Sequence, residues 1–134
     1  HISTDPARTI VGGLSNGGLA PAYIGLKYPA VFGNVLSQSG SFWWKPEGEQ
    51  EYEWLARQFV AFDRLPLRFY LEMGSLENVR YRDRPTPLMA SRHFRDVLQA
   101  KGYQVDYVEF SGGHDYLCWR GTLADGLLAL TKKS

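Results

Sequence analysis

Ser15 is the central residue of the pentapeptide Gly13-Leu14-Ser15-Asn16-Gly17, where a short β-branched run gives way to a helix-like stretch. A G-x-S-x-G motif at such a junction is typical of a nucleophile elbow, in which the serine stands on a strained turn above a helix N-terminus. Close approach of the backbone in that turn is expected to require glycine two residues before and two residues after the serine. An ordinary glycine-rich turn is the alternative, but the strand and helix context favours nucleophilic catalysis.

A serine nucleophile needs a base, and His114 is the best placed histidine. It follows the fourth β-like run of the chain, in Gly112-Gly113-His114-Asp115. Because the carboxyl ends of parallel strands meet at one edge of a sheet, Ser15 and His114 are expected at the same edge. A surface histidine that bonds its own turn is the alternative. His93 falls on a predicted helix and His1 at the start of the chain, so neither suits the role.

The base should be oriented by a carboxylate, and Glu77 fits best because it follows the third β-like run. The resulting chain order of serine, acid and histidine is that of α/β-hydrolases. Glu72 lies inside the predicted strand and should point into a helix layer or solvent, and Asp83 lies further along the loop. Asp115, next to the histidine, is expected to fix its own loop.

The backbone N–H of Asn16, directly after the nucleophile, is the expected oxyanion donor.

Trp43 and Trp44 could stack on aromatic rings of a substrate, and Arg120 could face an anionic group. Packing in the protein interior is an equal alternative for the tryptophans. Residues 77–95 hold five arginines against two acidic residues, which could attract an anion, although a solvated surface is the simpler explanation.

Four β-like runs alternate with four helix-like runs, which is typical of parallel βαβ units in an α/β fold with helices on both faces of the sheet. The predicted strands cover residues 9–11, 32–37, 67–73 and 103–110, and the predicted helices lie at 17–27, near 54–59, at 88–101 and near 119–130. Pro21 is expected in or close to the first turn of its helix. Backbone N–H groups in that turn have no acceptor within the helix, so a proline without an N–H is tolerated there.

The chain of 134 residues is 44% hydrophobic and 22% charged, which suits one compact domain and excludes a disordered chain. A formal net charge of +1 does not mark a nucleic-acid binder. Cys118, the single cysteine, excludes a disulfide scaffold, lacks partners at zinc-ligand spacing, and is expected to be a small buried residue. No apolar run reaches the ~18–20 residues of a membrane helix. Neither a metal nor an organic cofactor is expected, and neither nucleic acid nor a membrane as partner.

The first predicted strand would leave an open edge at what should be the centre of a hydrolase sheet. Residues 1–134 are therefore expected to form one partial catalytic domain, the C-terminal portion of the fold. Further strands and the second oxyanion loop would belong to an N-terminal half of the same enzyme, because the start at His1 looks like a cut. A cytoplasmic location is expected, with the periplasm as the alternative.

Three sequence blocks together resemble the catalytic part of the enterochelin (enterobactin) esterase family, which belongs to the esterase D-like α/β-hydrolases. The blocks are residues 13–19 (GLSNGGL), 35–44 (VLSQSGSFWW), and 112–115 (GGHD) with 118–121 (CWRG). The resemblance implies a serine esterase that cleaves the trilactone of a catecholate siderophore, or its ferric complex, through an acyl-enzyme. Ser15 then matches the nucleophile and His114 the base.

Two alternatives stay open at this point. The nearer one is an esterase or acyltransferase of the same fold that acts on another substrate, such as a feruloyl ester or a thioester. The more distant one is a hydrolase-like lobe that serves as a binding or structural module without catalysis. Fold alone does not choose among them, because specificity depends on contacts in the substrate pocket.

Overall fold

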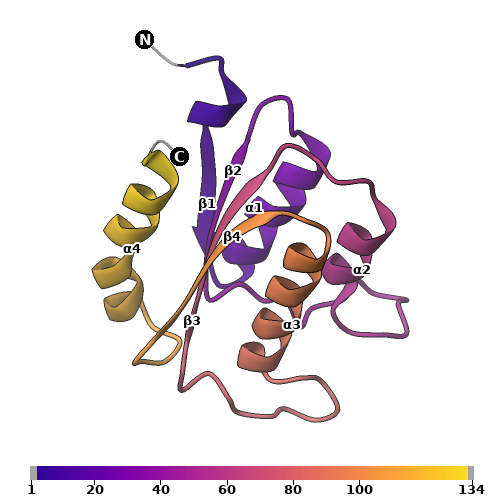
Figure 1. Ribbon diagram of the computed structural model, residues 1–134. Helices are drawn as coiled ribbons and strands as arrows, with labels where there is room; N and C mark the ends of the chain where they lie inside the picture. Colours follow the sequence, from indigo (N-terminus) through magenta and orange to yellow (C-terminus); the bar gives the residue numbers. More distant parts are fainter. Residues whose placement is uncertain (1–2, 133–134) are drawn as a thin grey trace.

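The computed structural model describes residues 3–132. Four parallel strands form one sheet in the order β1-β2-β3-β4, with the bounds β1 (Ile10–Leu14), β2 (Asn34–Gln38), β3 (Arg68–Gly74) and β4 (Gln104–Phe110). A helix follows each strand: α1 (Asn16–Lys27), α2 (Trp54–Ala61), α3 (Pro87–Ala100) and α4 (Tyr116–Thr131). A short 3-10 turn, η1 (Pro6–Arg8), precedes β1 (Figure 1). The predicted α/β alternation is confirmed.

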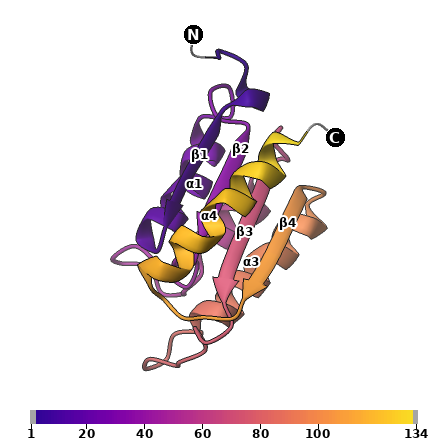
Figure 2. The ribbon, with the colours of Figure 1, turned by 90° about the vertical axis from the view of Figure 1, so that its left-hand side faces the viewer.

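The helices cover both faces of the sheet: α1, α2 and α3 lie on one face and α4 lies alone on the other (Figures 1 and 2). Successive residues of a strand point to opposite faces. Accordingly, Phe69 of β3 packs against Phe59 and Phe94 in the principal core, with ring centroids 5.7 and 6.4 Å away. The next residue, Tyr70, contributes to the smaller cluster that lies with Leu130 of α4.

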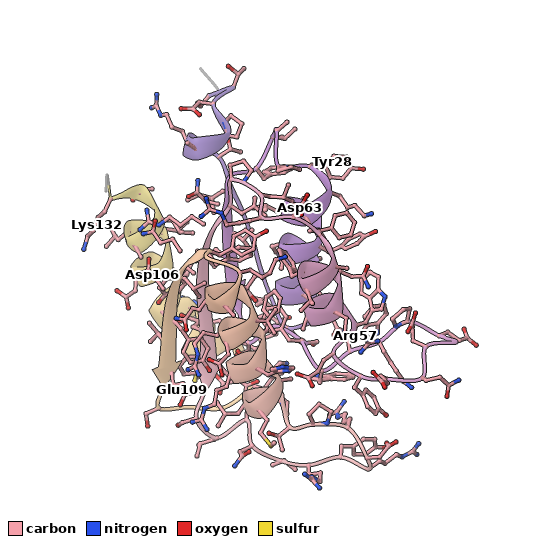
Figure 3. The ribbon with its side chains drawn as sticks, turned by 45° about the vertical axis from the view of Figure 1, so that its right-hand side comes forward. Tyr28, Arg57, Asp63, Asp106, Glu109 and Lys132 are labelled. Carbon is pink, nitrogen blue, oxygen red and sulfur yellow. The ribbon has the colours of Figure 1, made fainter. Side chains whose placement is uncertain are left out.

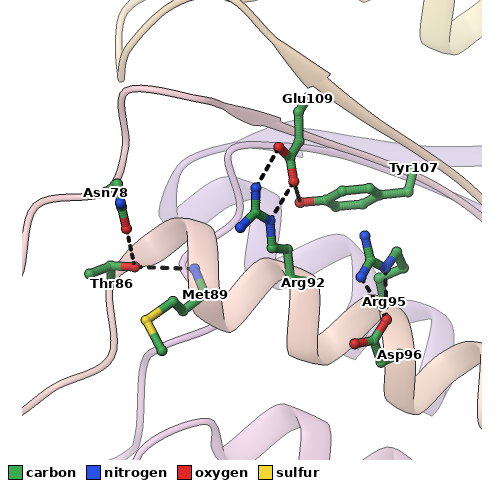
Figure 4. A network of polar contacts seen from close by, with 8 residues as sticks. All are labelled: Asn78, Thr86, Met89, Arg92, Arg95, Asp96, Tyr107 and Glu109. Atoms are coloured by element: carbon green, nitrogen blue, oxygen red, sulfur yellow. Dashed lines mark hydrogen bonds and ion pairs between the residues drawn. The ribbon is translucent and has the colours of Figure 1, made fainter.

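Helix α3 begins at a well-formed cap that also holds the preceding loop. Thr86 accepts a hydrogen bond from the backbone N–H of Met89 at 3.2 Å and donates one to Asn78 at 3.0 Å (Figure 4). Pro87 occupies the first helical position, where its missing N–H costs nothing. Beyond the helix, Gly102 takes the left-handed conformation with φ +84°, which ends it.

Ion pairs join elements across the surface. Arg92 of α3 binds Glu109 of β4 through two hydrogen bonds of 2.6 and 2.8 Å, and this contact lowers the pKa of the Glu109 carboxyl (Figure 4). Arg68 at the start of β3 pairs with Asp106 of β4 at 3.3 Å. On the opposite side of the molecule, Arg57 lies beside the loop that precedes α2 (Figure 3). These contacts fix the outer edges of the layers.

Three local predictions were wrong. Strand β1 extends past the predicted end at residue 11 through Gly12 and Gly13, because both glycines pair in register with β2. Pro21 is the sixth residue of α1, a turn later than expected, so no N–H at that position can reach the carbonyl of Gly17. Cys118 is half-buried rather than buried, because it lies in the exposed first turn of α4.

Strand β1 pairs with β2 alone among the strands of the described chain, so its other edge carries unpaired backbone groups. Within residues 3–132, no helix is long and apolar enough to cross a membrane.

Candidate active site

Ser15 occupies the sharp turn between β1 and α1. Its backbone has φ 57° and ψ −126°, a conformation that a residue with a side chain rarely adopts and that costs on the order of 1–3 kcal/mol. Three backbone N–H groups hold the Ser15 carbonyl in place: Gly18 at 2.8 Å, Leu19 at 3.3 Å and Ser41 at 3.1 Å. The strained turn predicted for a nucleophile elbow is therefore present, and it presents Ser15 at the carboxyl edge of the sheet.

The glycines around Ser15 differ in how much space surrounds them, and therefore in why a glycine stands at each position. A Cβ on Gly13 would lie 1.9 Å from the carbonyl oxygen of Gly17, so no side chain fits there. A Cβ on Gly18 would lie 2.9 Å from the carbonyl oxygen of Gln38 in β2, so this glycine allows α1 to approach the sheet. A Cβ on Gly17 would meet nothing within 4 Å. The expectation that glycine is required after the serine at position 17 is therefore wrong in steric terms.

Ser15, His114 and Glu77 form a continuous chain of hydrogen bonds. The Ser15 hydroxyl lies 2.8 Å from His114 Nε2, and His114 Nδ1 lies 2.5 Å from Glu77 Oε1. A neutral imidazole with its proton on Nδ1 donates to the carboxylate and accepts from the hydroxyl, which is the arrangement a general base needs. Ser15 follows β1, Glu77 follows β3 and His114 follows β4, so the parallel sheet brings the three residues together as predicted. Their catalytic roles stay predictions.

Glu77 is held by more than the histidine. Its other carboxylate oxygen, Oε2, accepts hydrogen bonds from the Ser39 hydroxyl at 2.5 Å and the backbone N–H of Gly74 at 2.8 Å. The Ser39 oxygen in turn accepts a hydrogen bond from Trp119 Nε1 at 2.9 Å, and the indole ring lies edge-on to the His114 imidazole. Sequence reasoning missed Ser39, although its position directly after β2 placed it at the same edge of the sheet.

Glu72, which was not expected to orient His114, points into the layer of α4 as expected. It is 1% exposed and accepts hydrogen bonds from the side chains of Gln38 at 2.7 Å and Thr122 at 2.5 Å. Burial raises the pKa of the Glu72 carboxyl, while these hydrogen bonds oppose the rise. Its contacts run to β2 and α4 and not to the imidazole, so it links α4 to the sheet.

The remaining carboxylates serve local structure. Asp83 is exposed and accepts a hydrogen bond from the Tyr52 hydroxyl at 3.1 Å. Asp115, which was expected to fix its own loop, caps α4 by accepting a hydrogen bond from the backbone N–H of Cys118 at 3.0 Å, and this bond lowers the pKa of the Asp115 carboxyl. Desolvation and the neighbouring Asp115 raise the pKa of the Cys118 thiol, which disfavours a thiolate nucleophile.

The backbone N–H of Asn16 opens α1 directly beside Ser15. The first N–H groups of a helix have no acceptor within the helix, so this donor is available to an oxyanion formed on the nucleophile. The second donor, expected on a loop after an earlier strand, stays a prediction. In the part of the chain that the structure describes, no group of histidine, cysteine or acidic side chains could hold a metal ion.

The predicted substrate residues lie in three different surroundings. Trp43 is half-buried against the core, and the guanidinium of Arg84 lies 3.9 Å above its ring. Trp44 packs edge-on against Trp54, with ring centroids 6.1 Å apart. Arg120 is exposed on α4 and forms no ion pair within residues 3–132. Packing is thus established for the tryptophans, and contact with a substrate stays a prediction for all three.

A hollow of about 920 Å³ lies at the other end of the sheet, where residues such as Arg8, Arg64 and Arg68 line it. It has no contact with Ser15, His114 or Glu77. In parallel sheets ligands bind beyond the carboxyl ends of the strands, so we place the candidate site at Ser15 and not in this hollow.

The chain is similar in sequence and structure to known esterases. An iron(III) enterobactin esterase from Dickeya dadantii is 40% identical over 142 residues, and the match covers 93% of this chain. The enterobactin esterase of Shigella flexneri, solved in the presence of 2,3-dihydroxy-N-benzoyl-serine, superposes with a TM-score of 0.80 at 38% identity over 96% of this chain. A ferulic acid esterase that is only 16% identical still superposes with a TM-score of 0.76, which shows a shared fold.

The chain spans 30% of the length of the Dickeya relative and 32% of the Shigella structure. Its four parallel strands and four helices are therefore part of the α/β-hydrolase fold of these esterases. Residues 1–130 match the family described as "Putative esterase". The match covers nearly the whole chain, and the chain belongs to this esterase family.

Proposed function

We propose that this chain carries the catalytic residues of a serine esterase that hydrolyses ester bonds of a catecholate siderophore. The observation that supports the proposal most directly is the chain of hydrogen bonds from Ser15 through His114 to Glu77, on a strained turn at the carboxyl edge of the sheet. Sequence similarity to an iron(III) enterobactin esterase, at 40% identity, supports the proposed substrate class.

The reaction proceeds in two steps. In the first, His114 Nε2 removes the proton of Ser15 as its Oγ bonds to the ester carbonyl carbon, and the Asn16 N–H stabilises the oxyanion. The carbon–oxygen bond to the leaving alcohol then breaks while His114 returns the proton to that oxygen. In the second step, a water molecule attacks the acyl-enzyme with the same base, and the acid is released with Ser15 restored.

Glu77 supports both steps from behind the imidazole. The Glu77 side chain is 2% exposed, while the His114 side chain is 47% exposed at the edge where substrate would enter. A buried carboxylate keeps the proton on Nδ1 and stabilises the imidazolium that forms as the serine loses its proton. No metal or organic cofactor takes part in this chemistry.

The substrate would be the trilactone of such a siderophore or its ferric complex, as with the relatives named for iron(III) enterobactin. Trp44 and Arg120 are proposed contacts for catechol rings and negative charge. Trp43 would act together with Arg84, since the guanidinium on its ring forms a cationic and aromatic surface. We also propose that an N-terminal part of the same enzyme completes the fold along the open edge of β1, and that the enzyme is cytoplasmic.

The test compares kcat/KM for a catecholate trilactone, its ferric complex, a feruloyl ester and a simple aryl ester. A siderophore esterase should favour the trilactone or the ferric complex over both other esters, and Ser15→Ala should abolish all four activities. Equal or greater kcat/KM for the feruloyl or aryl ester would place the protein among esterases for another substrate. Activity that survives in Ser15→Ala would overturn the mechanism.

A further inference from the structure

We propose that Ser39 and Trp119 are positioning residues that hold Glu77 in the orientation needed to engage His114. This inference rests on the proposed function and extends it from three residues to five. Neither Ser39 nor Trp119 would touch the substrate. Ser39 is 1% exposed and Trp119 is 4% exposed, so both act from behind the acid.

The contacts on the Glu77 carboxylate divide by oxygen atom. Oε1 faces His114, while Oε2 accepts hydrogen bonds from the Ser39 hydroxyl at 2.5 Å and the Gly74 N–H at 2.8 Å. Two donors on Oε2 fix the plane of the carboxylate and leave Oε1 to the imidazole. Hydrogen bonds to a charged group are short and about twice as strong as neutral ones, so the Ser39 contact contributes substantially to this orientation.

Trp119 determines which way the Ser39 hydroxyl points. The indole Nε1–H donates to the Ser39 oxygen at 2.9 Å, so the Ser39 hydroxyl proton is directed to Glu77 and not toward α4. The same indole lies edge-on to the His114 ring, with centroids 4.8 Å apart and the planes at 88°. Trp119 therefore limits the rotation of the base directly and that of the acid through Ser39.

The backbone at Ser39 indicates that this placement has a conformational cost. Its φ of 47° lies in the left-handed region, which a serine adopts only where the surroundings hold it. The Ser39 N–H donates to the Glu72 carbonyl at 2.8 Å, and this bond fastens the turn after β2 to β3. Glu72 then binds Thr122, one turn after Trp119 on α4. The turn and the helix are thus anchored to the same strand.

A double-mutant cycle on fluorophosphonate labelling of Ser15 tests the proposal with the wild-type chain, Ser39→Ala, Glu77→Ala and the double variant. Ser39→Ala should slow labelling by about 10-fold, in line with the loss of one hydrogen bond to a charged group. In the Glu77→Ala background, the same change should have no further effect, because Ser39 acts through Glu77. An equal slowing in both backgrounds, or none in either, would overturn the proposal.

Two further variants complete the design. Trp119→Phe keeps an aromatic ring beside His114 but lacks the N–H, so it should slow labelling only where Glu77 is present. Ser37→Ala removes another fully buried serine hydroxyl, one without a hydrogen-bond partner in the described chain, and should leave the rate unchanged. A Ser37→Ala effect as large as that of Ser39→Ala would mean that any loss of a buried hydroxyl slows the reaction, against the proposal.

Hydrogen exchange of the Trp119 indole proton, followed by NMR, gives a readout that needs no nucleophile. The proton should exchange slowly in the wild-type chain and faster in Ser39→Ala, while thermal unfolding of the two proteins shows that the fold persists in the variant. Rapid exchange in the wild-type chain would overturn the hydrogen-bond chain. A chain that is not labelled at Ser15 but has a protected indole proton would contradict the proposed function and leave the Trp119–Ser39 contact standing.

Discussion

Glu77 Oε1 lies 2.5 Å from His114 Nδ1, although the two residues follow different strands and are separated by the whole of α3 and β4. The contact is possible because β3 and β4 are parallel neighbours, with Gly74 in register with Phe110 at their carboxyl ends. The loops that leave the two strands are also bonded, since the Leu76 N–H donates to the Gly112 carbonyl at 3.0 Å. Acid and base therefore share one rigid edge.

Replacement of Glu77 should impair the orientation of the His114 imidazole without impairing substrate binding. Glu77→Gln keeps the side-chain volume but favours the wrong imidazole tautomer, so kcat should fall roughly 10⁴-fold, as when the acid of a serine protease triad is replaced by its amide. The KM should change little, because buried Glu77 lies behind the imidazole. Steady-state kinetics on an ester substrate checks both. A decrease of less than tenfold in kcat would show that another group serves as the acid.

The two glycines of the elbow motif should respond in opposite ways to alanine. Gly13→Ala places a Cβ 1.9 Å from the Gly17 carbonyl oxygen, so the turn must shift and the free energy of unfolding should fall by more than about 2 kcal/mol. Gly17→Ala meets open space in a helix and should be neutral or stabilising by up to about 1 kcal/mol. Urea unfolding measures both variants. Equal destabilisation by the two changes would refute this difference.

Glu72 should make stability fall with rising pH over one window. Burial raises its pKa, with a further rise from Asp125, against hydrogen bonds from Thr122, Gln38 and Tyr70. Between the ordinary glutamate pKa and the raised one, the folded chain keeps a proton that the unfolded chain loses, so the free energy of unfolding decreases as pH rises.

Glu72→Gln cannot titrate, so that contribution should vanish. Denaturant unfolding of both proteins from about pH 4 to pH 8, a range chosen around the ordinary carboxyl pKa, checks this prediction. The variant should gain stability relative to the wild-type chain as the pH rises. A difference that stays constant across the range would contradict the raised pKa.

Thr86 should stabilise both α3 and the loop that carries Glu77. Thr86→Ala removes the cap on the Met89 N–H and the bond to Asn78, so the free energy of unfolding should fall by about 1 kcal/mol. The matched control is Thr131→Ala, whose hydroxyl bonds its own helix at an exposed end and whose loss should cost less than about 0.5 kcal/mol. Thermal unfolding of both variants decides whether the cap has this effect.

Much of the site could be predicted because parallel topology converts chain order into proximity. Ser15, Glu77 and His114 each come directly after a β-like run, so their convergence at one edge followed from the alternation of strands and helices. The expected local role of Asp115 also followed from its position beside His114, although its part in capping α4 emerged only in the structure.

Other features depend on tertiary contacts that no local pattern encodes. Because glycine is rare in strands, the local pattern ends the first predicted strand at residue 11, yet register with Leu36 of β2 keeps Gly12 in β1. The role of Ser39 depends on a positive φ and on the indole of Trp119, which lies 80 residues away in the chain. Likewise, nothing local shows that the guanidinium of Arg84 stacks on Trp43.

Fluorophosphonate labelling of the chain, read by intact mass and peptide mapping beside a Ser15→Ala control, tests the central claim most directly. The account predicts one adduct, located on Ser15, and none in the control, because only a serine with a bonded base and an oxyanion donor reacts readily with this reagent. A folded chain that is labelled at another residue, or that is labelled equally in Ser15→Ala, would contradict the assignment of Ser15 as an activated nucleophile.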